Sequence, residues 1–544
     1  MAKNRNYFLI IILLSLLPFL TIFISPDLPH TSDGGVHLPR IAAYVKALND
    51  FHIPVRWAGD LNFNYGMPLF NFMYQLPYIV ASTLALLGST LVFSFKFSLY
   101  LSFLLSGIFM FLYIKNLTSD SFKAFVVSVF YLYAPFRLIE LTIRGSLGGV
   151  FAYSFLPMVL WAITKYKIKN SAPNFILISI SVFLLILSHN SLSLVFFGLI
   201  FFYSFIYIND RKLIINILLS LGLGLALSSF YWMPAIFEHK FTYGDLFMKD
   251  LYNEHFPPFI NFFIPNFFYW KKLNTAEISV QFGVFHLLST FVATHLLLSK
   301  RKKSIVIKKI LYFILFFTIV SIFFMQPISL VFWDKIKLLR QFQFPWRLLS
   351  VITFTTSIFS LALFEYPKIF KNRTILLILA LTVISTMFYW YPRQGFDKVD
   401  EADFWNYPLN TTYFGETDVI WSAGQASGYA DDQIQVIDGM ASISKLTKIT
   451  QTHTFTVDAQ IDTRLVDNTQ FFPGWRVYVD GTQVPIQFQD PNWRGLITFD
   501  VPSGVHEIKV KFGESKVRFI SNIITILSFM SIFIIFLKQK LYKS

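Results

Sequence analysis

One short segment of the chain gathers ionisable side chains. Residues 30–40 read HTSDGGVHLPR and hold Asp33, His37 and Arg40 directly after the first apolar run. A carboxylate can take a proton from a hydroxyl group, or it can bind a divalent metal ion together with an imidazole. The two glycines beside Asp33 allow a substrate to approach the backbone closely. The alternative is structural, because Asp33 could instead cap a helix that we predict over 36–50.

Three arginines suit the binding of an anion such as a phosphate. Arg137 and Arg144 flank Glu140, and a glycine-rich turn follows. Arg347 begins an apolar run, where an unpaired guanidinium is costly and needs an anionic partner. Structural alternatives exist here too, because Arg137 and Arg144 could brace Glu140, and Arg347 could reach lipid headgroups.

Three more polar residues lie beside apolar runs. His189 separates two such runs, so it is a candidate for binding or a helix-breaking corner. Glu238 follows another run and could be a second acid or a metal ligand. Arg56, in the polar segment after the first run, is a further candidate for substrate binding.

The elements that must position these residues are membrane helices. The 544 residues are 55% hydrophobic and only 14% charged, with a mean hydropathy of +0.55, which is unlike a soluble protein. Repeated apolar runs of near-spanning length predict a polytopic α-helical membrane protein. The net charge of +15 comes from Lys and Arg in short loops, which is the positive-inside pattern and argues against nucleic acid as a partner. The absence of cysteine excludes disulfides, thiolate catalysis and Cys-ligated zinc.

The basic loops also predict the topology. All of them are cytoplasmic only if residues 69–93 form a re-entrant or interfacial helix instead of a full span. We then expect about twelve spans and both termini in the cytoplasm, with the candidate residues on the outer face of the plasma membrane. The first run is expected to be an uncleaved span and not a signal peptide. The predicted spans lie near 7–25, 94–114, 123–139, 149–164, 173–188, 191–208, 213–232, 284–299, 310–325, 346–364, 374–391 and 518–537.

The chain changes character at 392–516. Apolar runs stop, and segments such as 454–458 and 507–512 alternate apolar and polar residues as strands do. Asp480-Gly481 is a typical hairpin turn. We therefore expect a membrane domain (1–391), an extracytoplasmic β-sandwich (392–516), and a last span with a cytoplasmic tail (517–544).

Several motifs resemble a bacterial membrane-protein family. The segments at 30–40, 54–57 (PVRW), 66–70 (GMPLF) and 343–347 (QFPWR) are similar to proteins catalogued as "6-pyruvoyl-tetrahydropterin synthase-related", a label that implies no pterin chemistry here. In the predicted β-sandwich, FFPGWRVYVDG at 471–481 and VPSGVH at 501–506 resemble the C-terminal domain of YfhO-type membrane proteins.

Through this family the chain resembles the GT-C superfamily of glycosyltransferases, which use polyprenyl-phosphate sugars. The resemblance implies an acidic residue in the first outer loop, and Asp33 holds that place. Arg144–Gly148 is similar to an Arg-Ser-x-Ala-Gly motif of oligosaccharyltransferases, but Gly149 and Val150 stand where a second acid is expected. The resemblance therefore favours Asp33 as a metal-independent base, with Glu238 as a distant alternative ligand. A divalent metal ion fits the pattern but is not required by it.

The expected function follows from this resemblance. A GT-C-like membrane domain would move a sugar from a polyprenyl-phosphate carrier to a glycan, lipid or protein acceptor of the cell envelope. The alternative is a non-catalytic protein, either a lipid or polysaccharide transporter, an assembly factor or an inactive relative. The expected roles are base for Asp33, phosphate binding for Arg347 with Arg144, Arg137 and His189, and orientation of Asp33 or the sugar for His37 and Arg40.

Overall fold

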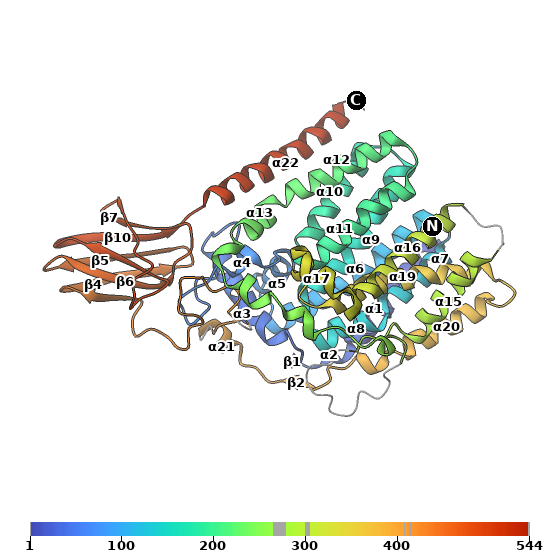
Figure 1. The fold of residues 1–544 in the computed structure, drawn as a ribbon, viewed down its shortest axis with the longest axis horizontal. Helices are drawn as coiled ribbons and strands as arrows, with labels where there is room; N and C mark the ends of the chain where they lie inside the picture. The colour runs from blue at the N-terminus through green and yellow to red at the C-terminus, as the bar shows by residue number, and fades with distance from the viewer. Residues whose placement is uncertain (1, 265–278, 300–304, 407–408, 413–414, 542–544) are drawn as a thin grey trace.

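The protein is a helical bundle with a small β-domain (434–512) at one end (Figure 1). The computed structural model describes residues 2–264, 279–299, 305–406, 409–412 and 415–541. The last helix, α22 (Lys516–Leu541), runs from the β-domain back along the bundle, where it contacts α10, α12 and α13.

Many helices are long and apolar enough to cross a membrane. Within the described residues there are eight such helices, or ten if each of two bent pairs is one span. The eight are Asn6–Ile24 (in α1 to α2), α6 (Leu91–Thr118), α9 (Leu147–Ile168), α11 (Asn190–Tyr207), Ile307–Phe324 (in α16), Pro345–Glu365 (around α19), Asn372–Tyr389 (around α20) and Lys516–Gln539 (in α22). The bent pairs are α7 (Ser121–Leu132) with Pro135–Arg144, and α12 (Arg211–Leu227) with α13 (Ser229–Phe237).

These helices agree with the hydropathy of the sequence. Each predicted span overlaps one of them, or one of the shorter apolar helices α10 (Ala172–Ile186) and α15 (Val284–Leu298). The predicted fold class, a polytopic α-helical membrane protein with a C-terminal β-domain, is therefore confirmed.

Residues 69–93 do not form a spanning helix. They hold α4 (Leu69–Phe72), α5 (Leu76–Leu86) and the start of α6. Helix α5 has 11 residues and is about 17 Å long, whereas the apolar core of a bilayer is about 30 Å thick. It packs against α3 (Gly34–Asn49), as expected of a re-entrant or interfacial helix.

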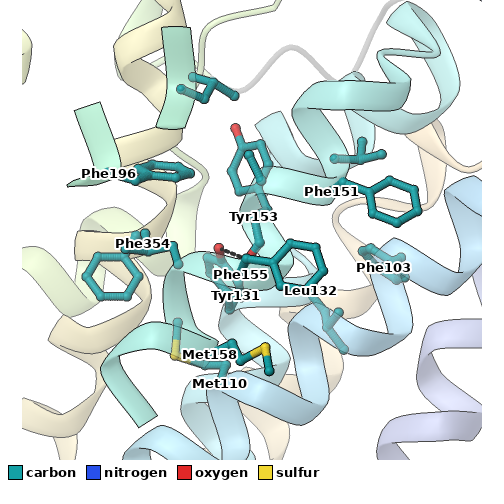
Figure 2. Close-up of a cluster of buried hydrophobic side chains, with 14 of the residues drawn as sticks. Phe103, Met110, Tyr131, Leu132, Phe151, Tyr153, Phe155, Met158, Phe196 and Phe354 are labelled. Atoms are coloured by element: carbon teal, nitrogen blue, oxygen red, sulfur yellow. Dashed lines mark hydrogen bonds between the residues drawn. The ribbon is translucent and has the colours of Figure 1, made fainter. Parts of the chain in front are cut away.

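The centre of the bundle is an apolar cluster between α6, α9 and their neighbours. Figure 2 shows this cluster, in which Phe103 and Met110 come from α6 and Phe196 and Phe354 from α11 and α19 (Leu349–Phe359). Tyr131 donates a hydrogen bond to the Tyr153 carbonyl oxygen at 2.8 Å, which joins α7 to α9. This packing fixes the helix ends that carry the candidate residues.

The β-domain consists of two antiparallel sheets. One has the strand order β3 (Ile434–Asp438), β6 (Thr463–Gln470), β9 (Leu496–Val501). The other has the order β4 (Ala441–Ile449), β5 (Thr452–Ala459), β10 (Gly504–Phe512), β7 (Trp475–Val479), β8 (Thr482–Val484). Inward residues of both sheets form one core, so the domain is a sandwich as predicted.

Residues 392–433 lie between the bundle and the β-domain and belong to neither sheet. Their β2 (Phe396–Asp397) pairs with β1 (Leu28–Pro29), and α21 (Glu401–Asn406) contacts α3. The Glu401 carboxylate accepts hydrogen bonds from the first two backbone N–H groups of α6, both at 2.8 Å. The predicted boundary at 392 thus precedes the first sandwich strand by some forty residues. Of those that the structure describes, β2 and α21 pack on the membrane domain, whereas Val419 and Trp421 pack on the core of the sandwich.

Candidate functional site

The loop before α3 is held against the loop before α9. The backbone N–H of Asp33 donates to the Arg144 carbonyl oxygen at 2.8 Å, and that of Ser32 donates to Ile143 at 3.0 Å. The Asp33 side chain makes no capping hydrogen bond to α3; instead Thr31 Oγ1 accepts from the Gly34 N–H at 3.0 Å. The carboxylate of Asp33 is therefore not committed to the helix-capping role that the sequence left open.

Arg144 lies between two carboxylates. Its Nη2 is 3.5 Å from Asp33 Oδ2, and its Nη1 is 2.7 Å from Glu140 Oε1. The guanidinium carbon lies 4.8 Å from the centre of the Trp346 ring. The exposed fractions are 12% for the Arg144 side chain, 3% for Glu140 and 21% for Asp33, so the network is mostly enclosed while Asp33 keeps an open side.

The glycines after Arg144 make room for this network. A Cβ atom on Gly149 would lie 2.7 Å from Glu140 Oε2, and one on Gly148 would lie 2.4 Å from Cζ of Tyr74. Glu140 thus places a second carboxylate on the guanidinium that pairs with Asp33, although position 149 is glycine. Sequence reasoning named Glu140 only as a brace, although its spacing of four from Arg144 was the available signal.

A small cavity adjoins this network and has room for about one water molecule. It is lined by Phe136, Glu140, Arg144, Tyr153, His189, Leu192 and Arg347. Arg347 donates from Nη1 to the Phe342 carbonyl oxygen at 2.9 Å, and its guanidinium lies 4.9 Å from the Phe344 ring centre. In the part of the chain that the structure describes, Arg347 Nε and the Tyr153 hydroxyl are buried without a hydrogen-bond partner.

Buried polar groups without partners are uncommon, because each one carries a desolvation penalty. Two such groups on one cavity, next to a second guanidinium, are an arrangement suited to an anion. Tyr153 was not predicted, since it lies within an apolar run and gives no signal in the sequence.

Arg137 lies one side chain away from the cavity. It is fully buried, donates to Ser106 Oγ at 2.9 Å, and places its guanidinium 4.4 Å from the Tyr153 ring centre. Figure 2 shows Tyr153 as part of the apolar cluster, between Phe196 and Phe151. Arg137 therefore supports Tyr153 in this structure and does not line the cavity.

The two histidines of the site are joined by a row of aromatic rings. His189 stacks on Tyr74 at 5.5 Å and Tyr74 stacks on Tyr78 at 5.6 Å, while the Tyr78 hydroxyl hydrogen-bonds His37 Nδ1 at 2.9 Å. His189 Nδ1 accepts from the Leu192 N–H at 3.3 Å and so also caps α11. The helix-corner interpretation of His189 thus applies, and its place on the cavity wall leaves the binding role as a prediction.

Both imidazoles are neutral near pH 7. Burial, followed by the charge of Arg40, lowers the pKa of His37 to about 3. Enclosure by the protein, with the charges of Arg347 and Arg144, holds the pKa of His189 well below its usual value. The histidines can accept or donate hydrogen bonds in this site but do not carry positive charge.

Arg40 faces residues 392–433 and not Asp33. It donates from Nε to Thr411 Oγ1 at 3.2 Å and also to the Thr411 carbonyl oxygen. Arg40 also hydrogen-bonds Tyr78, whose hydroxyl contacts His37, so it is linked to the site through the aromatic side chains. Its expected role in orienting Asp33 or the sugar stays a prediction.

Arg56 and Glu238 belong to a second buried cluster at the base of the β-domain. Arg56 is 3.3 Å from Glu514 and donates to Asn522 Oδ1 at 2.8 Å. Glu238 Oε1 is 3.2 Å from Arg518 Nε. The cluster joins the first loop, α13 and the start of α22, and neither residue lines the cavity at Arg347.

No set of three or more His, Cys, Asp or Glu side chains that could hold a metal ion occurs among the described residues. Glu238 in particular is engaged by Arg518 Nε and by Asn71 Nδ2, the latter at 2.8 Å. The alternative of Glu238 as a distant metal ligand to Asp33 receives no support from its surroundings.

Residues 70–339 match the family described as "6-pyruvoyl-tetrahydropterin synthase related domain; membrane protein". This match confirms the family resemblance that the loop motifs predicted. No curated protein sequence matches the chain.

Solved structures of two glycosyltransferases resemble the fold. They are the oligosaccharyltransferase AglB of Archaeoglobus fulgidus and the arabinofuranosyltransferase AftD from Mycobacteria. The apo form of the former has a TM-score of 0.46 and 12% identity, and the match covers 73% of this chain and 56% of that chain. Its complex with an inhibitory peptide and a dolichol-phosphate also has a TM-score of 0.46 and 12% identity, with coverages of 76% and 56%. For AftD the TM-score is 0.44, the identity 15%, and the coverages 72% and 27%. The matches thus span little more than half of the first enzyme and about a quarter of the second.

Proposed function

We propose that this membrane protein, with its 6-pyruvoyl-tetrahydropterin synthase related domain, is a glycosyltransferase. The donor would be a sugar on a polyprenyl-phosphate carrier, and the acceptor a hydroxyl group of an envelope glycan, lipid or protein. One observation carries the proposal: the Asp33 carboxylate and the guanidinium groups of Arg144 and Arg347 meet at one end of the bundle, beside a cavity with unpartnered donors.

The residues supply the two groups that a single displacement needs. The acceptor oxygen attacks the anomeric carbon while Asp33 takes the acceptor proton. The bond between that carbon and the carrier phosphate breaks, and the electron pair stays on the phosphate oxygen. Arg347, whose Nε is unpartnered among the described residues, lines the cavity and stabilises this charge from its wall.

The position of the site supports a reaction on the outer face of the membrane. Phe72 accepts a hydrogen bond from Asn190 beside the cavity at 2.8 Å and also contacts Phe472 of the β-domain, so site and β-domain share one end of the bundle. Lys165 and Lys167 lie in the last turn of α9, about 27 and 30 Å along the helix from its first residue, Leu147. Basic residues mark the cytoplasmic ends of membrane helices, so the site belongs to the opposite side.

The test is transfer by the purified protein in nanodiscs, with a panel of polyprenyl-phosphate sugars. We expect Asp33→Asn to reduce turnover by about 10²–10⁴-fold, because the general base is lost. The matched control is Asp458→Asn, the same chemical change at an exposed position of β5, which leaves turnover unchanged. Equal turnover by the wild-type protein and Asp33→Asn removes Asp33 from the role of base. Tight donor binding without transfer by the wild-type protein favours the non-catalytic alternative.

A further inference from the structure

The position of Arg144 raises the question of what neutralises the two acids at the site. Asp33 precedes α3 and Glu140 begins the turn Glu140–Arg144, so the two carboxylates come from segments a hundred residues apart. Arg144 contacts both, at 3.5 Å and 2.7 Å. Here two carboxylates from separate loops share one cation, the guanidinium of Arg144. Proteins also bind divalent metal ions between carboxylates in this way.

The guanidinium is fixed in this place by its surroundings. Its ring contact with Trp346 and the hydrogen bond from the Asp33 N–H to the Arg144 carbonyl oxygen hold both ends of the residue. Gly149 leaves the space that the Glu140 carboxylate occupies, since a Cβ atom there would lie 2.7 Å from Glu140 Oε2. A metal ion between the acids would have to displace a buried and stacked side chain.

The charges around the two acids also argue against a metal ion between them. Two acidic side chains, Asp33 and Glu140, are matched by two arginines, Arg144 and Arg347, and Arg137 lies close enough to Glu140 to add a third positive charge. The acids are therefore balanced without any added ion. A divalent cation between the acids would also be repelled by Arg347, which lines the same cavity.

We propose that Arg144 is a built-in cation that takes the place of a divalent metal ion between Asp33 and Glu140. It pairs with the Asp33 carboxylate beside the cavity and keeps the two acids together, and the site therefore needs no metal for its geometry. For the reaction, the proposal implies that transfer does not depend on added metal, and this part rests on the proposed function. The arrangement of Arg144 between the two acids is independent of the proposed function.

The experiment measures binding of Mn²⁺ by electron paramagnetic resonance, with protein in nanodiscs of zwitterionic lipid. The wild-type protein is expected to bind no Mn²⁺ at this site. Arg144→Ser leaves two carboxylates without their cation, and it should bind Mn²⁺ at least about tenfold more tightly than the wild-type protein. Adding Glu140→Gln to Arg144→Ser should abolish this binding.

Arg144→Lys is the second variant, in case Arg144→Ser does not fold. It keeps the positive charge and should bind no more Mn²⁺ than the wild-type protein. The proposal is overturned if the wild-type protein binds Mn²⁺ and loses it on Asp33→Asn or Glu140→Gln, or if folded Arg144→Ser gains no binding.

Transfer is measured separately, with and without a chelator. A chelator that stops transfer by the wild-type protein contradicts metal independence. If the Mn²⁺ results are as expected but no donor supports transfer, the proposed function fails while the inference about Arg144 stands.

Discussion

The buried pair of Glu238 and Arg518 gives the sharpest prediction about the second cluster. The perturbation is Glu238→Gln, which keeps the size of the side chain and removes its charge. The exposed fractions of the two side chains are 2% and 0%, and their closest atoms are 3.2 Å apart. Because Glu238 does not line the cavity, the variant should lose stability and not the chemistry of transfer.

The magnitude follows from what remains around Arg518. Removing one partner of a buried ion pair typically costs about 3–5 kcal/mol, because the other charge stays buried and uncompensated. Here the glutamine oxygen can still accept a hydrogen bond, and Arg518 keeps its contact with the Gly513 carbonyl oxygen at 3.3 Å. We therefore expect a loss near the lower end, about 3 kcal/mol. Arg518→Met combined with Glu238→Gln should cost less than the sum of the two single changes.

The assay is thermal unfolding in detergent, followed by fluorescence, together with hydrogen exchange at the start of α22. Glu238→Gln should unfold at a lower temperature and exchange faster near Ser515, where the helix joins the β-domain. The control is Glu254→Gln, the same change at an exposed position. An unchanged unfolding temperature with unchanged exchange would refute the reasoning that this pair fastens α22 to the end of α13.

Three further predictions concern the cavity and its walls. Arg347→Met should lower kcat/KM about 10²–10³-fold, because a hydrogen-bond donor to the leaving phosphate is lost. The kcat/KM of Arg347→Lys should lie between the values of Arg347→Met and the wild-type protein. Full activity of Arg347→Met contradicts the assigned role. His37→Gln should leave the shape of the pH–rate profile unchanged between pH 5 and 8, because the pKa of His37 is about 3 and the imidazole is neutral over this range. Loss of an inflection near pH 6.5 in this variant would contradict the prediction. Gly148→Ala should destabilise the protein by about 1–3 kcal/mol, since its Cβ would meet the Tyr74 ring, whereas Gly198→Ala, with nothing within 4 Å, should be neutral or stabilising in the same unfolding assay.

Much of the membrane domain could be predicted because lipid imposes a simple rule on sequence. A segment that crosses the bilayer must be apolar over most of its length and must satisfy its own backbone hydrogen bonds. The positive charge of the loops then distinguishes the apolar segment that contains the short helix Leu76–Leu86 from the segments that span the membrane. The sandwich strands were predictable for a similar reason, since burial of one sheet face forces alternation, as in Gly504–Phe512.

The site was predictable only in part. Each of four predicted residues stands where an apolar run begins or ends, so the sequence places them all at the same end of the membrane helices: Asp33, Arg144, His189 and Arg347. In the structure the last three line one cavity, and Asp33 contacts Arg144. Arg56 has the same local signal, but its position depends on Glu514, a partner 458 residues away. No local pattern distinguishes an arginine that binds a ligand from one that pairs with a distant acid.

The pairing of Leu28–Pro29 with Phe396–Asp397 has a consequence for how the protein is made. His30 contacts Asp397 across 367 positions of the chain. A ribosome adds about 5–20 residues per second, so about 20–70 s separate the synthesis of the two strands. During that time the first helices are already in the membrane, and the segment that carries Asp33 has neither its partner strand nor the contact between Arg40 and Thr411. The site is therefore completed late in biogenesis, and an arrested nascent chain would hold the helices without a finished site.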